Sequence, residues 1–311
     1  MAGGHTPPVG GGGRRTPPGH VEGADRAHQA DDADRHGRTG SHRRRTGAAA
    51  TTALVVAVLA ASLALAAGAG RDVTPPGWDV VWEDDFTGTV LDSARWNVQD
   101  VASPRNNELQ HYSPDNVEVR DGLLRLATRR EDRQGRSFTS AAVDTFGKVS
   151  LTYGRVEVRA RLPQMGQGLW PAFWMLGTGC HPTGPPCPWP AAGANEIDLM
   201  EAVNSPSTLH NDLHYADSPG RSLSTGPCSR AVDDLSADFH TFAVEWLPGG
   251  EVRWYLDDDR VCERRVPGHL EGPMYLILNT AVGGDWPGPP AAATTFPQQL
   301  HIDRVRVLRR A

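Results

Sequence analysis

From Trp78 to the end of the chain, apolar and polar side chains alternate with a period of two. Between residues 153 and 162, four apolar positions alternate with four charged ones: Val156, Val158, Ala160 and Leu162 against Arg155, Glu157, Arg159 and Arg161. Successive side chains of a β-strand point to opposite faces of its sheet. The pattern therefore predicts a strand with one face in the core and the other in water.

The same alternation predicts a run of hairpins near residue 250. Two apolar triplets are each followed by a turn: Phe242, Val244 and Trp246 before the Pro-Gly-Gly of residues 248–250, and Val252, Trp254 and Leu256 before the three aspartates of residues 257–259. Such residues suit tight turns between antiparallel strands. Val305 and Val307 predict a last strand. Because no helical period is sustained over three turns, we expect an all-β fold of two packed antiparallel sheets.

Residues 1–70 differ in composition from the rest of the chain. Residues 1–42 contain almost no large apolar side chain, so they cannot bury enough surface to offset the entropy of ordering, and we expect a disordered leader. Three arginines at residues 43–45 then precede an uncharged run at residues 46–70 that ends in small residues. This order is typical of a secretory signal peptide.

Residues 43–70 have two interpretations. Cleavage after Ala66 or Ala69 would release a secreted chain that begins near residue 71. Alternatively, the uncharged run is long enough, at about 1.5 Å per residue, to cross a bilayer of about 30 Å and to anchor the protein outside the cytoplasm. We favour cleavage, and we expect residues 71–311 to form one large domain.

Charge limits the partners of this domain. The whole chain has a net charge of −6, and its first 70 residues carry eight arginines against five acidic residues, so −9 remains on residues 71–311. Nucleic acids and sulfated polysaccharides attract basic surfaces. We therefore expect neither as a partner, whereas a neutral glycan tolerates an acidic protein.

The cysteines indicate an oxidising compartment. An even number of them lies in residues 71–311: Cys180, Cys187, Cys228 and Cys262. Their spacings lack the close C-x2-C pairs of structural zinc sites, which makes zinc the weaker alternative. We expect Cys180 to pair with Cys187 across a short loop and, by elimination, Cys228 to pair with Cys262.

Residues 195–201, NEIDLME, place three carboxylic acids within a short apolar segment. On a regular strand Glu196 and Asp198 share one face, while Glu201 falls on the opposite face, in the core. Because a buried unpaired carboxylate is costly, we predict a β-bulge at residue 199 or 200 that returns Glu201 to the other face. Two carboxyl groups about 5 to 5.5 Å apart are the nucleophile and proton donor of a retaining glycosidase. An acidic edge strand without chemistry is the alternative.

Tryptophans flank this acidic segment. GLWPAFW at residues 168–174 precedes it, and GGDWPG at residues 283–288 follows it. We expect Trp170 and Trp286, beside Pro and Gly in loops, and Trp174 to contact sugar rings, since indole faces stack on them. Phe173 is expected in the core. These aromatic neighbours favour a glycan site over an acidic edge strand.

The EIDLME segment resembles the bulged active-site strand of family 16 glycoside hydrolases, in the laminarinase branch. Similar motifs follow in order through residues 78–309: WEDDF at 82–86, NNELQ at 106–110, YGR at 153–155, GLWPAFWMLG at 168–177, LILNTAVGGDWPG at 276–288 and DRVRV at 303–307. The resemblance implies a jelly-roll β-sandwich with a concave cleft for a linear glycan. It also implies retaining endo-hydrolysis of β-1,3-glucosidic bonds in laminarin-type glucans.

Roles follow from this resemblance residue by residue. Glu196 resembles the nucleophile, Asp198 the supporting acid and Glu201 the general acid/base. His214 resembles a histidine that lies near these acids, although a lone histidine is often structural. Asn195 stands where the family often has glycine, so the loop that enters the strand is expected to differ.

The resemblance extends to a binding surface and a metal site. Asn107 and Glu108 resemble residues that line the glycone side of the cleft, with a plain surface loop as the alternative. Asp85, Gly122 and Asp303 resemble a structural calcium site far from the chemistry, with hard oxygen ligands. Asp85 is shorter than the glutamate common at its position. No cofactor is expected for catalysis.

Other functions share this fold. A glucan-recognition module would bind without cutting, but such members lack the two glutamates that this chain has. Mixed-linkage glucanases, β-1,3-galactanases and transglycosylases share the mechanism and differ in subsite shape. We expect a monomeric enzyme that acts on a linear β-glucan and that meets a membrane only if residues 46–70 are retained.

Overall fold

The computed structural model describes residues 74–311, except residues 103–104, 182–186, 188, 191–193 and 219–220. The chain divides into two units, Met1–Gly70 and Arg71–Ala311. The predicted leader and signal segment, with the cleavage positions, lie outside the described residues. Among the described residues, no helix combines the length and the apolar character needed to cross a bilayer.

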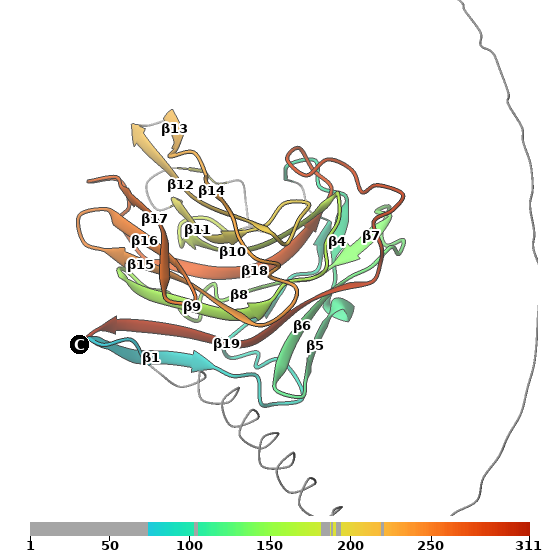
Figure 1. Ribbon diagram of the computed structural model, residues 1–311, viewed down its shortest axis with the longest axis horizontal. Coiled ribbons are helices and arrows are strands. Elements are labelled where there is room, and N and C mark those ends of the chain that lie inside the picture. The colour runs from blue at the N-terminus through green and yellow to red at the C-terminus, as the bar shows by residue number, and fades with distance from the viewer. Residues whose placement is uncertain (1–73, 103–104, 182–186, 188, 191–193, 219–220) are drawn as a thin grey trace, which may run out of the picture. The chain divides into compact units, whose positions relative to one another are not determined.

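Two large antiparallel sheets make up the described part of the second unit (Figure 1). The first sheet consists of β1 (Trp78–Asp84), β5 (Val117–Arg120), β6 (Leu123–Thr128), β9 (Gly154–Arg161), β15 (His240–Leu247), β16 (Glu251–Leu256), β17 (Asp259–Arg265) and β19 (Gln298–Arg310). The second consists of β2 (Asn97–Val98), β8 (Ala142–Asp144), β10 (Leu169–Gly177), β11 (Glu196–Glu201), β12 (Thr208–Ser218), β13 (Arg221–Ser224), β14 (Cys228–Ala231) and β18 (Met274–Val282). The predicted all-β class, with two packed antiparallel sheets, is confirmed.

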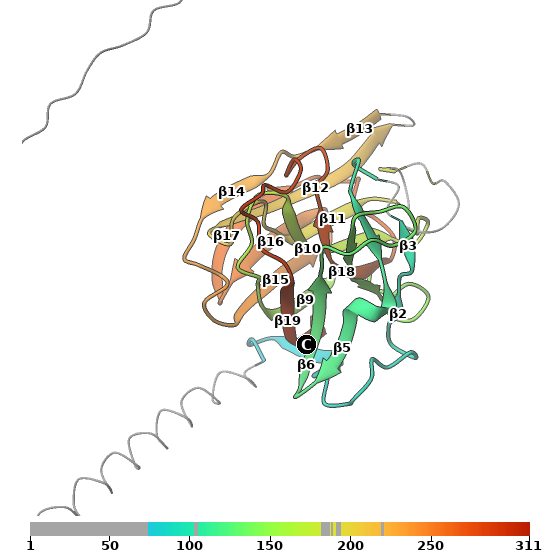
Figure 2. The ribbon, with the colours of Figure 1, turned by 90° about the vertical axis from the view of Figure 1, so that its right-hand side faces the viewer.

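A small third sheet and one short helix complete the described elements. The sheet joins β3 (Val101–Ala102), β4 (Gln110–Tyr112) and β7 (Phe138–Ser140), and the 3-10 helix η1 covers Pro114–Asn116. The hairpin strands predicted near residue 250 form as β15, β16 and β17, and the last predicted strand forms as β19. Figure 2 shows β5 and β6 beside β9 and β19, and β10, β11 and β12 in the other layer.

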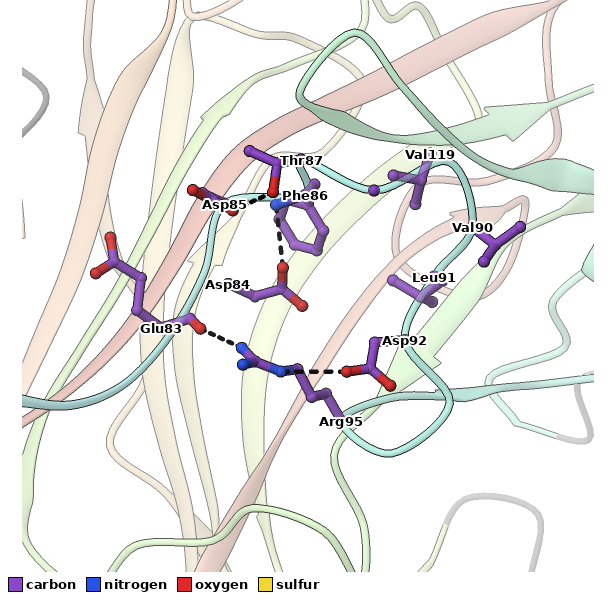
Figure 3. Close-up of a pocket in the computed structure, with 11 residues that line it drawn as sticks. Glu83, Asp84, Asp85, Phe86, Thr87, Val90, Leu91, Asp92, Arg95 and Val119 are labelled. Atoms are coloured by element: carbon purple, nitrogen blue, oxygen red, sulfur yellow. Dashed lines mark hydrogen bonds and ion pairs between the residues drawn. The ribbon is translucent and has the colours of Figure 1, made fainter.

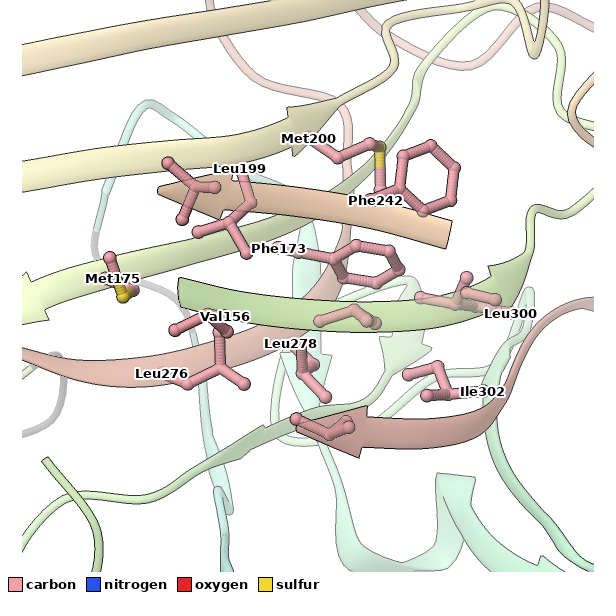
Figure 4. Close-up of a cluster of buried hydrophobic side chains, with 14 of the residues drawn as sticks. Val156, Phe173, Met175, Leu199, Met200, Phe242, Leu276, Leu278, Leu300 and Ile302 are labelled. Carbon is pink, nitrogen blue, oxygen red and sulfur yellow. The ribbon is translucent and has the colours of Figure 1, made fainter. Parts of the chain in front are cut away.

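The core fills the space between the two large sheets (Figure 4). Phe173 of β10 is fully buried, as predicted, and its ring meets the ring of Phe242 of β15 edge-on at 5.6 Å. Burying one such side chain contributes about 1.5 to 3 kcal/mol. Alternate residues of β10 point away from this core, so the second sheet has one outer face that the core leaves uncovered. We call it the catalytic face, defined by Trp170, Trp174, Glu196 and His214.

The prediction for β9 is confirmed on its apolar face and wrong for part of its charged face. Arg155 and Glu157 are only 3% and 6% exposed rather than in water. The Arg155 guanidinium donates hydrogen bonds to Glu157 at 2.8 Å and to Glu245 at 3.2 Å, and it lies 4.9 Å from the Tyr255 ring centre. Partners from neighbouring strands cover these charges, and the pattern of a single strand does not show them.

Candidate active site

Strand β11 carries the three acids and contains the predicted bulge. Asp198 and Met200 face consecutive residues of β10, so Leu199 is the extra residue. Against β12 the register also shifts between Asp198 and Glu201. Leu199 and Met200 are both buried in the core (Figure 4), and Glu201 therefore returns to the catalytic face.

Two indoles hold the two glutamates. Trp170 Nε1 donates to Glu201 Oε1 at 3.0 Å, and Trp189 Nε1 donates to Glu196 Oε2 at 3.0 Å. Trp170 lies in strand β10, not in the loop that its Pro neighbour suggested, because the strand begins one residue earlier, at Leu169. The sequence reasoning missed Trp189, although a Trp-Pro pair seven residues before the first acid was a signal for it.

His214 lies among the acids, as the resemblance implied. It pairs directly with Glu196 across β11 and β12. Its Nε2 is 3.3 Å from Asp198 Oδ2 and 3.9 Å from Glu196 Oε1. The centre of the Trp189 ring lies 5.4 Å from the centre of the His214 imidazole, so the indole also restricts the orientation of this imidazole.

Burial gives the three acids unusual protonation. Burial and the nearby Asp198 raise the pKa of Glu196 to about 8, while the charges of His214 and Arg105 and the Trp189 hydrogen bond act in the opposite direction. Burial, and then the Asp198 and Glu196 charges, hold the pKa of Glu201 well above its ordinary value. The pKa of Asp198 is also well above the ordinary range, because the side chain is buried beside other acids. The three acids together thus retain protons at neutral pH, and they titrate as one coupled cluster rather than as separate residues.

The other predicted indoles also lie by the catalytic face. Trp286 is 42% exposed, and its ring meets the ring of Trp170 edge-on at 5.4 Å. Trp174 is half-buried on β10, and its Nε1 donates to Asn279 Oδ1 at 2.8 Å. An indole that is fixed by a hydrogen bond and partly exposed presents a preformed apolar surface, as a sugar ring requires.

Asn107 and Glu108 are joined to the loop that carries Trp286. Asn107 Nδ2 donates to Asp285 Oδ1 at 2.8 Å, and Glu108 forms an isolated β-bridge with Gly283. Glu108 is only 7% exposed and accepts hydrogen bonds from Asn106 and Gln110. Glu108 is therefore held as a rigid acceptor rather than placed on a plain surface loop.

Both expected disulfides form. Cys180 pairs with Cys187, and Cys228 pairs with Cys262. The first bridge lies in the loop between β10 and β11, two residues before Trp189. Tyr275 on the catalytic face donates its hydroxyl to the Cys180 carbonyl oxygen at 3.0 Å. The bridge and this contact tie the loop to the sheet beside the acids.

The strand register of the first sheet brings the three residues expected to bind calcium to the same part of strand β19. Strand β19 pairs with β6 up to Ile302 and with β1 from Val305 onward. Asp303 thus falls between the end of β1, which Asp85 follows, and the start of β6, which Gly122 precedes. Carboxylate and carbonyl oxygens there suit a hard cation.

The surroundings of these oxygens fit a cation only in part. Asp85 lines an acidic pocket of about 480 Å³ (Figure 3), and its Oδ1 accepts a hydrogen bond from Thr87 at 3.2 Å. Asp303 Oδ2 is bonded by the Arg159 guanidinium. A divalent ion would have to share that oxygen with a positive charge.

Paired glutamates on the outer face of a β-sandwich sheet, with exposed indoles beside them, define a glycosidase of the two-carboxylate class. Residues 105–305 match Glycosyl hydrolases family 16, and the chain belongs to this family. A beta-glucanase of Rhodothermus marinus is 37% identical over 83% of this chain and 94% of its own length.

Solved structures agree with this membership. The laminarinase catalytic domain of Thermotoga maritima matches with a TM-score of 0.65 and 34% identity, over 75% of this chain and 98% of that one. A variant of LamA from Zobellia galactanivorans, in complex with laminaritriose and laminaritetraose, matches with a TM-score of 0.66 and 30% identity, over 74% of this chain and 98% of that one. The jelly-roll class expected from the sequence is that of these proteins.

Proposed function

We propose that residues 71–311 hydrolyse internal β-1,3-glucosidic bonds of linear, laminarin-type β-glucans with retention of configuration. The observation that carries the proposal is the bulged strand β11, which brings Glu196 and Glu201 to one face in different surroundings. Membership of family 16 and similarity to a beta-glucanase and to laminarinases support it. The paired cysteines support an extracellular location.

The two glutamates divide the chemistry. Glu196 is the nucleophile, because Trp189 donates to its carboxylate and the charge of His214 stabilises its anion. Glu201 starts protonated and gives its proton to the departing oxygen while Glu196 attacks the anomeric carbon. Glu201 then takes a proton from water, which attacks the glycosyl-enzyme and releases Glu196. Asp198 lies two residues further along β11, between the two glutamates in sequence, and orients Glu196.

Replacing each glutamate separates the two roles. Glu196→Ala is expected to remove laminarin hydrolysis, and azide is expected to restore turnover of an activated β-glucoside by forming the α-azide. Glu201→Ala is expected to keep glycosylation by a good leaving group and to yield the β-azide. On laminarin, Glu201→Ala should lose about 10²- to 10⁴-fold in rate. The same azide anomer from both variants would refute the assignment.

Products and substrates test the rest of the proposal. Proton NMR of the unmodified enzyme is expected to show the β-anomer first. Parallel assays on laminarin, lichenan and β-1,3-galactan identify the substrate, and faster release from galactan than from laminarin would place the enzyme in another branch. Glucan binding without release of reducing ends would favour a recognition module.

Structural calcium at Asp85, Gly122 and Asp303 is part of the proposal. Calcium is expected to raise the melting temperature and EDTA to lower it, without a change in the pH profile of activity. Asp85→Asn should abolish the calcium effect, since it removes a negatively charged ligand. Equal melting temperatures with calcium and with EDTA would count against the site.

A further inference from the structure

Asp212 is a fourth carboxylate on the catalytic face. It pairs directly with Asp198 across β11 and β12, so the two side chains project from the same face. It is 4% exposed, and Asp198 is 2% exposed. Like charges placed opposite each other in a sheet are unfavourable, and burial increases the cost. The roles of the glutamates do not require this residue.

Three donors hydrogen-bond to the Asp212 carboxylate. The Leu213 amide and the Thr225 hydroxyl each donate to Oδ1 at 2.7 Å, and the Ser224 hydroxyl donates to Oδ2. The Ser224 oxygen itself accepts from the Gly226 amide at 2.9 Å, which leaves its hydrogen free to point to Asp212. The three hydrogen bonds hold the carboxylate in one orientation.

His214 connects Asp212 to the catalytic acids. Its Nε2 lies 3.8 Å from Asp212 Oδ2, 3.3 Å from Asp198 Oδ2 and 3.9 Å from Glu196 Oε1. One imidazole nitrogen thus lies within 4 Å of three carboxyl groups. Because Nε2 lies between Asp212 and Asp198, the same nitrogen is the one directed toward Glu196.

We propose that Asp212 is a positioning residue of the catalytic cluster, which keeps a proton on Asp198 beside Glu196 and anchors the imidazole of His214. The inference rests on the proposed function. A second ionised carboxylate directly opposite Asp212 is unfavourable, so Asp198 keeps its proton beside Glu196. Burial, and next the charge of Asp212, raise the pKa of Asp198 accordingly.

Few other charged groups face this pair. Strand β11 contributes Glu196 and Glu201, and β12 contributes His210 and His214. The neighbours of Asp198 and Asp212 on β10 and on residues 221–226 are uncharged: Trp174, Ser224 and Thr225. The charge of Arg105 acts on Glu196. Burial lowers the pKa of His210, so it adds little positive charge near neutrality. Asp212 therefore sets the balance of charge on this side of the cluster.

Asp212→Asn tests the inference, because it keeps the shape and removes the charge. Without that charge the cluster binds protons less tightly, so both limbs of the pH profile of kcat/KM are expected to move to lower pH by about one unit. Asp217→Asn is the matched control. It removes an aspartate of the same strand that pairs with Arg221 instead, at 2.9 Å, and should leave both limbs in place.

A second variant covers the case in which Asp212→Asn fails to fold. Thr225→Val removes one donor from the Asp212 carboxylate and keeps its charge, so the limbs should move measurably, but less than in Asp212→Asn. Uniform loss of activity at every pH, with unmoved limbs in both variants, would overturn the inference and indicate a structural role. If Glu196→Ala still cleaved laminarin, the proposed function itself would fall, whatever Asp212→Asn showed.

Discussion

At the scale of single residues, the surroundings of each acid decide its chemical role. Glu196 and Glu201 are identical side chains five positions apart, and both are deeply placed in the sheet. Glu196 faces His214 and the Trp189 indole, which favour its anion, whereas Glu201 faces the two other acids, which favour its proton. The difference that catalysis needs therefore comes from the neighbours of each acid, both on β11 and on adjoining segments.

The pH dependence of activity follows from these shifts. Glu196 must be ionised to attack, and its pKa is raised from 4.5 to about 8, so activity should fall as the pH drops through the raised value. Glu201 must be protonated, and its raised pKa keeps that proton as the pH rises. Initial rates of laminarin cleavage should show two limbs. The acid limb, set by Glu196, should lie above pH 4.5, and the basic limb, set by Glu201, should lie at higher pH than the acid limb. An acid limb at the ordinary glutamate value would contradict the assignment.

Trp189→Phe is expected to lower kcat/KM about tenfold or more, since it removes a hydrogen bond to a carboxylate worth about 1.5 to 3 kcal/mol. The acid limb should move to higher pH, because the Glu196 anion loses a donor. Trp286→Phe is the matched comparison. Its indole meets the Trp170 ring edge-on, and its loss should raise KM while the limbs stay in place. A limb shift in Trp286→Phe alone would reverse the two roles.

At the scale of elements, strand β10 needs a defined start to present Trp170. Gly168 precedes this strand with φ of +89°, and an added Cβ would lie 2.4 Å from the Pro290 backbone nitrogen. Its amide donates to Asn204 Oδ1 at 2.7 Å, and its carbonyl oxygen accepts from the Gly283 amide at 2.8 Å. This glycine thus lets the segment that ends in Pro290 approach β10.

Gly168→Ala is therefore expected to destabilise the fold by about 2 to 4 kcal/mol, through the clash and the left-handed backbone. Gly147→Ala is the control, with φ of +69° and no atom within 4 Å of the added Cβ. It should cost about 1 kcal/mol. Chemical unfolding monitored by tryptophan fluorescence measures both, and equal losses would show that the approach of Pro290 contributes nothing.

At the scale of the whole described domain, the two disulfides have different tasks. Cys228 lies on β14 of the second sheet and Cys262 on β17 of the first, so this bridge joins the two sheets. It spans 34 residues, whereas the Cys180–Cys187 bridge spans seven. A disulfide constrains the unfolded chain more when it closes a longer loop. The expected contribution to the free energy of unfolding is about 3 to 4 kcal/mol for Cys228–Cys262 and about 2 kcal/mol for Cys180–Cys187.

Replacing the cysteines pairwise by serine should separate stability from activity. The Cys228→Ser, Cys262→Ser variant is expected to show the larger fall in melting temperature. The Cys180→Ser, Cys187→Ser variant is expected to show the larger fall in kcat/KM, because the Cys180–Cys187 bridge anchors the loop of Trp189. Scanning calorimetry and laminarin assays on the same preparations measure the two effects. Loss of stability and activity in the same proportion in both variants would argue against this division.

The sequence by itself determined the all-β class, the positions of the hairpin strands and the bulge in β11, whereas it predicts the second cysteine pair only by elimination. These follow from local rules: side chains alternate along a strand, and Glu201 cannot remain unpaired in the core. Tertiary structure alone decided that Trp189 bonds to Glu196 and that Asp212 lies opposite Asp198. It also covered Arg155 and Glu157, which the strand pattern placed in water. Each of these contacts joins segments whose register depends on the packing of the whole sheet, and no local pattern in the chain specifies it.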